Sequence, residues 1–271
     1  MTIIRRFLAA LQFLTVLQVP TPFPTEELGR SAPCFPFVGL AIGGLTVVVD
    51  LAAGAVGIPW SVRTVIAVMV PAIVSGGLHL DGLADTADGF WSSRSRDKIL
   101  EIMRDSRIGT MGVLALLAIL GLKAAAVSDL ATGPWRTIAL LLAPILGRSL
   151  QVVGLTWMPY ARPEGGLATV FLPYRSGVAG VFACVVPVAL LGAMLGMFQS
   201  NDAFLPGLIT ILLLIAAMAF LIAWWGNVCR DRIGGMTGDT LGALSELGET
   251  LFLLVICRVA AAVAIAAGVC R

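Results

Sequence analysis

Residues 205–225, LPGLITILLLIAAMAFLIAWW, form a long run without a charged side chain. A helix that crosses the hydrocarbon core of a bilayer needs about 20 such residues. Further apolar runs lie at about 36–57, 64–79, 111–130, 137–159, 177–198 and 250–268. The pattern predicts an all-α fold, a polytopic integral membrane bundle of about six to seven transmembrane helices. The 64–79 run is short and contains Pro71, so it is expected to kink or to continue into the following segment.

The composition agrees with this class. Of the 271 residues, 58% are hydrophobic and 13% are charged, whereas a soluble domain carries roughly 25% charged residues. No insert is large enough for a soluble domain, so a single membrane domain over 1–271 is expected. Residues 7–17 are predicted to lie at or dip into the membrane as a short helix, because Pro20 ends that run early. The five cysteines contain no C-x-x-C pair, which favours buried thiols over disulfides or a zinc site.

Cations are distributed unevenly between the two sides of the predicted bundle. One side receives the N-terminal segment and loops at about 80–110, 160–176 and 226–249, and it holds most of them: Arg5, Arg6, Arg30, Arg94, Arg96, Lys98, Arg104, Arg107, Arg162, Arg175, Arg230 and Arg232. The other side holds Arg63, Arg136 and Arg271. Loops rich in Lys and Arg stay in the cytoplasm, so the first side is predicted to be cytoplasmic. The same side also gathers the aspartates and the glycine-rich turns, which points to a polar active site there.

The first of these loops contains GGLHLDGLADTADGFW, residues 76–91. Asp81, Asp85 and Asp88 have the spacing of one helix face. Carboxylates on one face repel one another unless a cation lies between them, and hard oxygen ligands of this kind suit Mg²⁺. The three aspartates are therefore candidate metal ligands and catalytic residues, and the alternative is a solvated acidic helix start. His79 is a candidate general base or metal-site neighbour, although a lone histidine is more often structural.

The next segment, RSRDKILEIMRDSRIGTMG at 94–112, supplies cations beside that face. Asp105 is a candidate fourth metal ligand. Arg104 is a candidate contact for the bound phosphate group, and Arg107 could clamp a phosphate as a catalytic residue. The alternative for the basic residues is a helix on the membrane surface that binds anionic headgroups.

Two more segments complete the predicted site. NVCRDRIGGMTGDTLGALSELGE, residues 227–249, has a glycine-rich turn that opens a helix, an arrangement suited to phosphate. Its candidates are Arg230, Arg232, Gly238 and Thr240 for phosphate and Asp239 for the metal, and a plain capped helix start is the alternative.

MPYARPEGGLATVF, residues 158–171, offers Arg162 to a phosphate or a carboxamide, or is only a tight interhelical loop. Together the segments indicate metal-assisted phosphoryl transfer, with the phosphoryl donor bound at the bundle itself.

The same segments resemble, in order, the motifs of the cobalamin synthase family, the adenosylcobinamide-GDP ribazoletransferases. The resemblance spans nearly the whole chain and includes FPFVGLAIGG near the first long span, although some members have Glu where this chain has Leu80. It implies attack by a hydroxyl of α-ribazole, or of its 5′-phosphate, on the cobinamide-side phosphorus of GDP-cobinamide. GMP would leave, adenosylcobalamin or its 5′-phosphate would form, and Mg²⁺ would be required.

The resemblance also implies the surroundings of the protein. These are a prokaryotic cytoplasmic (inner) membrane with the site facing the cytoplasm, no nucleic acid, and either a homo-oligomer or an association with other corrinoid-pathway enzymes.

Two other functions stay open at this stage. A CDP-alcohol phosphotransferase also splits a nucleotide diphosphate with carboxylates, but its motif has Arg where this chain has Asp85 after Ala84. An ion-coupled transporter would place its charges near the bilayer midplane rather than at one end of the spans.

Overall fold

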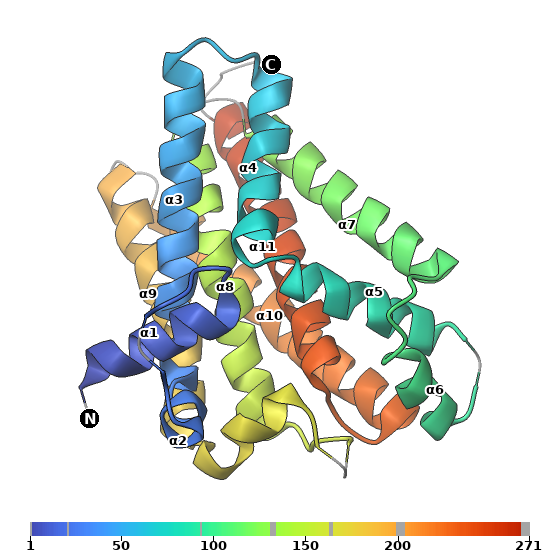
Figure 1. The fold of residues 1–271 in the computed structure, drawn as a ribbon. Helices are drawn as coiled ribbons and strands as arrows, with labels where there is room; N and C mark the ends of the chain where they lie inside the picture. The colour runs from blue at the N-terminus through green and yellow to red at the C-terminus, as the bar shows by residue number, and fades with distance from the viewer. Residues whose placement is uncertain are drawn as a thin grey trace.

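The fold is a bundle of helices (Figure 1). The computed structural model describes all residues except 1, 21, 93, 131–133, 163–164, 199–203 and 267–271, so Arg271 lies outside the described residues. The elements are α1 (Ile3–Leu14), α2 (Thr25–Gly29), η1 (Ala32–Cys34), α3 (Phe35–Ala55), α4 (Trp60–Val74), α5 (Leu78–Phe90), α6 (Arg96–Ile102), α7 (Thr110–Asp129), α8 (Trp135–Trp157), η2 (Leu167–Tyr174), α9 (Gly177–Phe198), α10 (Phe204–Ile233) and α11 (Gly238–Ala266). Within the described ranges the only extended pairing is an isolated bridge between Tyr160 and Met236.

Six helices are long and apolar enough to cross a membrane, which confirms the predicted class. They are the spans Ala32–Ala55, Thr110–Asp129, Trp135–Trp157, Gly177–Met194, Leu208–Ile233 and Gly238–Ala261. Helices α4 and α5, bent by 88° relative to each other, count as a seventh span if the pair is taken as one broken span. Gly76 and Gly77 make this bend, because both have positive φ angles, 61° and 74°, that other residues rarely adopt. The short run around Pro71 therefore does continue into the aspartate segment, through a sharp turn.

Helix α8 is the centre of the bundle. Of its most apolar window, 94% is buried, against 28% for α7, α9 and α10, which leave most of their surface free for lipid. Helix α3 packs closely on α8 because it presents glycine there. A Cβ added at Gly39 would lie 2.5 Å from the carbonyl oxygen of Pro144, and one at Gly43 would meet that of Leu141. Small residues of this kind let membrane helices approach backbone to backbone.

The end of the bundle away from the predicted site is tied by ion pairs. Asp50 on α3 accepts from Arg63 on α4 at 2.8 Å and from Arg136 on α8 at 2.7 Å. The guanidinium of Arg136 also lies 4.0 Å from the ring centroid of Trp60. Arg63 and Arg136, the predicted cations of this side that the structure describes, therefore both pair with one buried carboxylate.

The predicted loops are more helical than expected. Segment 226–249 is a short turn at 234–237 between the long helices α10 and α11, and segment 80–110 holds α5 and α6. The sequence placed the last span at 250–268, whereas α11 begins at Gly238. Its first turns carry polar residues that pack against α5 and α8, so hydropathy alone missed its start.

Candidate active site

Helices α5 and α11 cross at a place where both carry glycine. A Cβ added at Gly82 would lie 2.7 Å from the carbonyl oxygen of Asp239, and one at Gly242 would lie 3.2 Å from the Cα of His79. These distances leave little or no room for a side chain, so the glycines allow the two backbones to touch. The crossing therefore places Asp239, at the start of α11, beside the aspartates of α5.

The carboxylates at this crossing crowd one another. Asp85 is half-buried, and its negative charge is opposed by those of Asp81, Asp239 and Asp88, while Arg162 attracts it. Like charges held together favour the binding of a cation between them. Carboxylate oxygens suit Mg²⁺, which usually binds one or two of them together with substrate phosphates. Asp81, Asp85 and Asp239 are therefore the candidate carboxylates from which one or two would bind a magnesium ion.

The described residues do not form a finished metal cage. Among them, no three His, Cys, Asp or Glu side chains are arranged so that they could hold a metal ion, so at most two of these carboxylates can bind one ion as placed. This fits the habit of Mg²⁺, which keeps several non-protein oxygens in its shell. Water and substrate phosphate would therefore have to supply the remaining ligands.

Arg162 faces the carboxylates from the 158–162 segment. Its Nη2 donates to Oδ2 of Asp239 at 2.8 Å, while its buried Nε has no hydrogen-bond partner among the described residues. The loop is held by two backbone hydrogen bonds of 2.8 Å, from the Ala161 N–H to the Met236 carbonyl and from the Met236 N–H to the Pro159 carbonyl. A fixed guanidinium with a free N–H can bind a phosphate oxygen.

The turn before α11 is a self-contained helix cap. The Thr240 hydroxyl donates to the Thr237 carbonyl oxygen at 3.1 Å and accepts from the Thr237 N–H at 2.8 Å. Thr240 is buried, so the structure gives its side chain a capping role in place of an exposed phosphate contact. Gly238, the first residue of α11, does line the cavity described below.

Asp88 holds the start of α7. Its Oδ2 accepts from the Gly109 N–H at 2.6 Å and its Oδ1 from the Gly112 N–H at 2.8 Å. A side chain at either glycine would collide with the carboxylate. Both oxygens of Asp88 therefore satisfy N–H groups at a helix N-terminus, and this contact explains the two glycines of the DSRIGTMG segment.

Asp105 and Arg107 form a pair at the surface. Arg107 Nη2 lies 2.6 Å from Asp105 Oδ2, and the Arg107 side chain is 86% exposed. Hydrogen bonds from Arg107 lower the pKa of Asp105 to about 2. Neither residue lines the cavity at the crossing, and the structure pairs the two with each other.

The remaining arginine candidates divide between two regions. Burial raises the pKa of Tyr160, and the charges of Arg162, Asp239 and Arg104 also act on this hydroxyl, which places Arg104 near the crossing. Tyr160, whose buried hydroxyl has no partner among the described residues, was not predicted as a site residue.

Arg230 and Arg232 lie elsewhere, exposed at the end of α10. Arg230 contacts Asn227 at 3.4 Å, and Arg232 lines a separate apolar pocket with Trp91 and Trp224. The structure therefore separates these two candidates from the cavity at the crossing.

A buried network of charges lies behind the crossing, inside the spans. Lys123 on α7 donates to Glu246 at 2.7 Å and to Glu249 at 2.6 Å. Glu249 also pairs with Arg148 on α8, whose Nη2 lies 3.3 Å from Nδ1 of His79. All five side chains are buried. From the sequence, the charges are expected at one end of the spans. The structure also places charges inside the bundle, and these are paired with one another.

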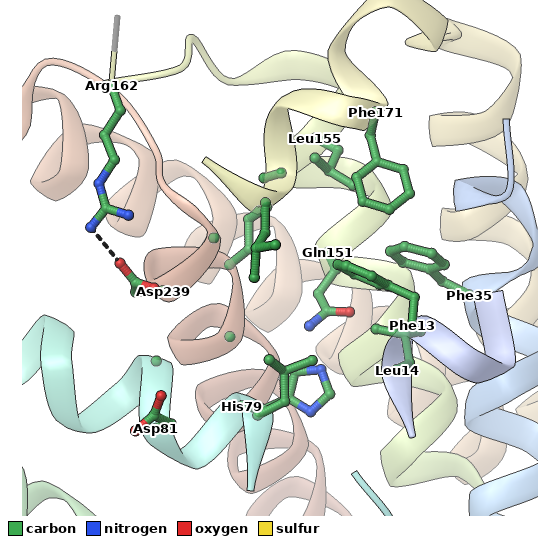
Figure 2. A pocket seen from close by; sticks show the side chains of 17 residues that line it. Phe13, Leu14, Phe35, His79, Asp81, Gln151, Leu155, Arg162, Phe171 and Asp239 are labelled. Atoms are coloured by element: carbon green, nitrogen blue, oxygen red, sulfur yellow. Dashed lines mark hydrogen bonds and ion pairs between the residues drawn. The ribbon is translucent and has the colours of Figure 1, made fainter. Parts of the chain in front are cut away.

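A cavity opens beside the crossing (Figure 2). Its volume is about 170 Å³, smaller than the roughly 300–1,000 Å³ of a site that encloses a whole drug-sized ligand, so it can take one ring system and not a complete large substrate. Asp81, Arg162 and Asp239 lie toward one side of it, and Phe13, Leu14, Phe35, Leu155 and Phe171 line the other. The cavity therefore combines a charged rim with an apolar interior.

Comparison with known proteins places the chain in a family. Residues 6–257 match the family described as CobS, cobalamin-5-phosphate synthase. An adenosylcobinamide-GDP ribazoletransferase of Roseiflexus sp. is 44% identical over 250 residues, covering 90% of this chain and 86% of that protein. Proteins of the same name from Klebsiella pneumoniae and Citrobacter koseri are both 39% identical and cover 98% and 97% of their own lengths, against 93% and 92% of this chain. No solved structure matches the chain. The chain therefore belongs to the cobalamin-5-phosphate synthase family.

Proposed function

We propose that this protein joins adenosylcobinamide-GDP to α-ribazole, or to α-ribazole 5′-phosphate. GMP is released, and adenosylcobalamin or its 5′-phosphate is formed. The names of its relatives support the substrates. The observation that carries the chemistry is the crossing of α5 and α11, where Asp81, Asp85 and Asp239 face Arg162 beside an open cavity.

In the proposed reaction, a ribose hydroxyl oxygen attacks the phosphorus on the cobinamide side of the diphosphate. A new P–O bond forms, the P–O bond to GMP breaks, and the proton of the attacking hydroxyl passes to water. Arg162 donates its free Nε–H to a phosphate oxygen and stays oriented by Asp239. One or two of the carboxylates Asp81, Asp85 and Asp239, together with substrate phosphate, would hold Mg²⁺, which would neutralise charge that develops on the diphosphate.

The test uses the purified full-length chain in lipid nanodiscs with adenosylcobinamide-GDP, α-ribazole and Mg²⁺. We expect GMP release and a corrinoid product of the mass of adenosylcobalamin, and both should stop when EDTA removes the metal. Turnover of CDP-alcohols, without turnover of adenosylcobinamide-GDP, would contradict the proposal and favour a phospholipid-type transferase. Inactivity with both substrate classes would also contradict it and would reopen a transport function.

We also propose that the protein lies in the cytoplasmic membrane with the crossing facing the cytoplasm, as the distribution of cations suggests. Single cysteines placed at exposed Ser95, beside α6, and at exposed Val56, after α3, would report the two sides. In a chain without other cysteines, a membrane-impermeant thiol reagent applied to intact cells should label Val56→Cys and not Ser95→Cys. The reverse pattern would contradict the orientation.

A further inference from the structure

The inner end of the cavity carries two neighbouring buried side chains, His79 and Gln151, each with one polar atom that makes no hydrogen bond of standard geometry. His79 is 1% exposed and Gln151 is 5% exposed. Neither Nε2 of His79 nor Oε1 of Gln151 has a hydrogen-bond partner among the described residues, and both side chains line the cavity. Figure 2 shows the imidazole and the amide next to each other, facing the space between α5 and α8. Buried polar atoms are nearly always paired, so unpaired ones that line a cavity point to a ligand.

The proton on the His79 ring can be assigned. Arg148 Nη2 lies 3.3 Å from His79 Nδ1, and a guanidinium can only donate. Nδ1 must therefore accept, which puts the proton of the neutral imidazole on Nε2. Arg148 is itself held by Glu249, on the far side from His79. The network thus fixes His79 as a hydrogen-bond donor toward the cavity and leaves no lone pair on Nε2 for a general base.

The wall opposite the polar end is aromatic. The rings of Phe13 and Phe35 each meet that of Phe171 edge to face, with centroids 5.0 and 5.4 Å apart. Leucines from α1, α8 and α11 complete the lining: Leu14, Leu155 and Leu241. Such a wall suits a flat aromatic body. The interior offers few polar atoms, so a base with several donors and acceptors around its edge, such as guanine, would bury unpaired groups there.

We propose that this cavity binds the benzimidazole ring of the α-ribazole acceptor, whose free ring nitrogen accepts from the Nε2–H of His79. The ring lies between the phenylalanine wall and the end marked by His79 and Gln151. The ribose then extends to the rim, where Asp81, Asp239 and Arg162 meet. This assignment rests on the proposed function for the identity of the ligand, and it gives His79 a role in substrate binding.

Equilibrium dialysis tests the contact without turnover. The full-length protein in nanodiscs is titrated with α-ribazole and with the α-riboside of 5,6-dimethylindole, in which C–H replaces the acceptor nitrogen. Wild type should bind α-ribazole about tenfold more tightly, the value of one hydrogen bond to a buried donor. His79→Phe keeps an aromatic ring and removes the donor, so it should bind both ribosides equally. An unchanged preference in His79→Phe would overturn the proposal, because a merely structural role would weaken both ligands alike.

A second pair of variants covers the case in which His79→Phe fails to fold. Phe171→Ala should weaken binding of both ribosides about tenfold or more and leave the Kd of adenosylcobinamide-GDP unchanged. Phe220→Ala, on the exposed face of α10, is the matched control and should change neither. Wild-type riboside binding by Phe171→Ala would overturn the proposal.

Turnover separates this proposal from the proposed function. If the protein is inactive but still binds α-ribazole through its ring nitrogen, the proposed reaction is wrong and the proposed binding pocket is supported. An active protein whose preference does not depend on His79 would contradict the pocket alone.

Discussion

The aspartates predicted as metal ligands from the sequence have different surroundings in the structure. Among the described residues, the carboxylates of Asp81 and Asp85 have no hydrogen-bond or ion-pair partner, and they repel each other at the crossing with Asp239. Both carboxylate oxygens of Asp88 accept hydrogen bonds from backbone N–H groups, and Asp105 is paired with Arg107 at the surface. Charge alone therefore does not identify a metal ligand. Under the proposed function, the residues expected to bind the metal are those whose carboxylates are unsatisfied and lie among like charges.

The change Asp81→Asn tests the expected metal binding. It keeps the shape of the side chain and removes a charge, so transfer should fall by roughly 100-fold or more. The midpoint of thermal unfolding should stay the same or rise, because repulsion with Asp85 is relieved. GMP release and thermal unfolding measure the two effects. Asp97→Asn, on exposed α6, is the control; equal activity in both variants would remove Asp81 from the site.

The change Asp88→Ala tests the hydrogen bonds to the start of α7. It leaves the N–H groups of Gly109 and Gly112 without their acceptor, so unfolding should become easier by about 1–2 kcal/mol. Thermal unfolding in detergent, followed by circular dichroism, measures the shift. Glu101→Ala removes an exposed carboxylate paired with Lys98 and should have almost no effect. If the two variants unfold alike, Asp88 does not anchor α7.

At the scale of elements, the site depends on how closely two helices approach. Helix α5 turns away from α4 at Gly76 and Gly77, and it then meets α11 at Gly82 and Gly242. At the turn the glycines supply the positive φ angles, and at the crossing they leave room for the two backbones, most strictly at Gly82. The positions of the carboxylates therefore follow from backbone packing, and small changes there should disturb the chemistry.

A matched pair of glycine substitutions measures this dependence. In Gly82→Ala the new Cβ would meet the backbone of Asp239 at 2.7 Å, so the helices must separate. We expect lower transfer activity and a lower unfolding temperature. Gly121→Ala, within α7, meets nothing within 4 Å and should be neutral or slightly stabilising, as alanine is the better helix former. Full activity in Gly82→Ala would show that the close approach is not required.

At the scale of the whole molecule, the bundle is held at two levels by buried ion pairs. Asp50 joins α3, α4 and α8 at one end. The network of Lys123, Glu246, Glu249 and Arg148 joins α7, α8 and α11 behind the site. Its two cations and two carboxylates balance, as buried charges within a membrane span must.

This balance predicts a specific non-additivity. Glu249→Gln leaves an excess cation buried in the spans, so unfolding should become easier by about 3 kcal/mol or more. Adding Lys123→Met restores neutrality, and the double variant should be more stable than the sum of the two single changes. Thermal unfolding of the four proteins in one detergent gives the comparison. Strict additivity would contradict an electrostatic network.

The sequence by itself determined the helical class, the spans and the segments that carry chemistry. Those properties depend on hydropathy and spacing within single stretches, such as 205–225 and 76–91. Only the tertiary structure decided which of the polar residues meet. Arg162 and Asp239 are 77 residues apart, Asp88 and Gly109 are 21 apart, and Lys123 and Glu249 are 126 apart. Such contacts arise from the packing of helices, which local patterns do not encode. Asp88, Thr240 and His79 are therefore all site candidates in the sequence, although their contacts in the structure differ.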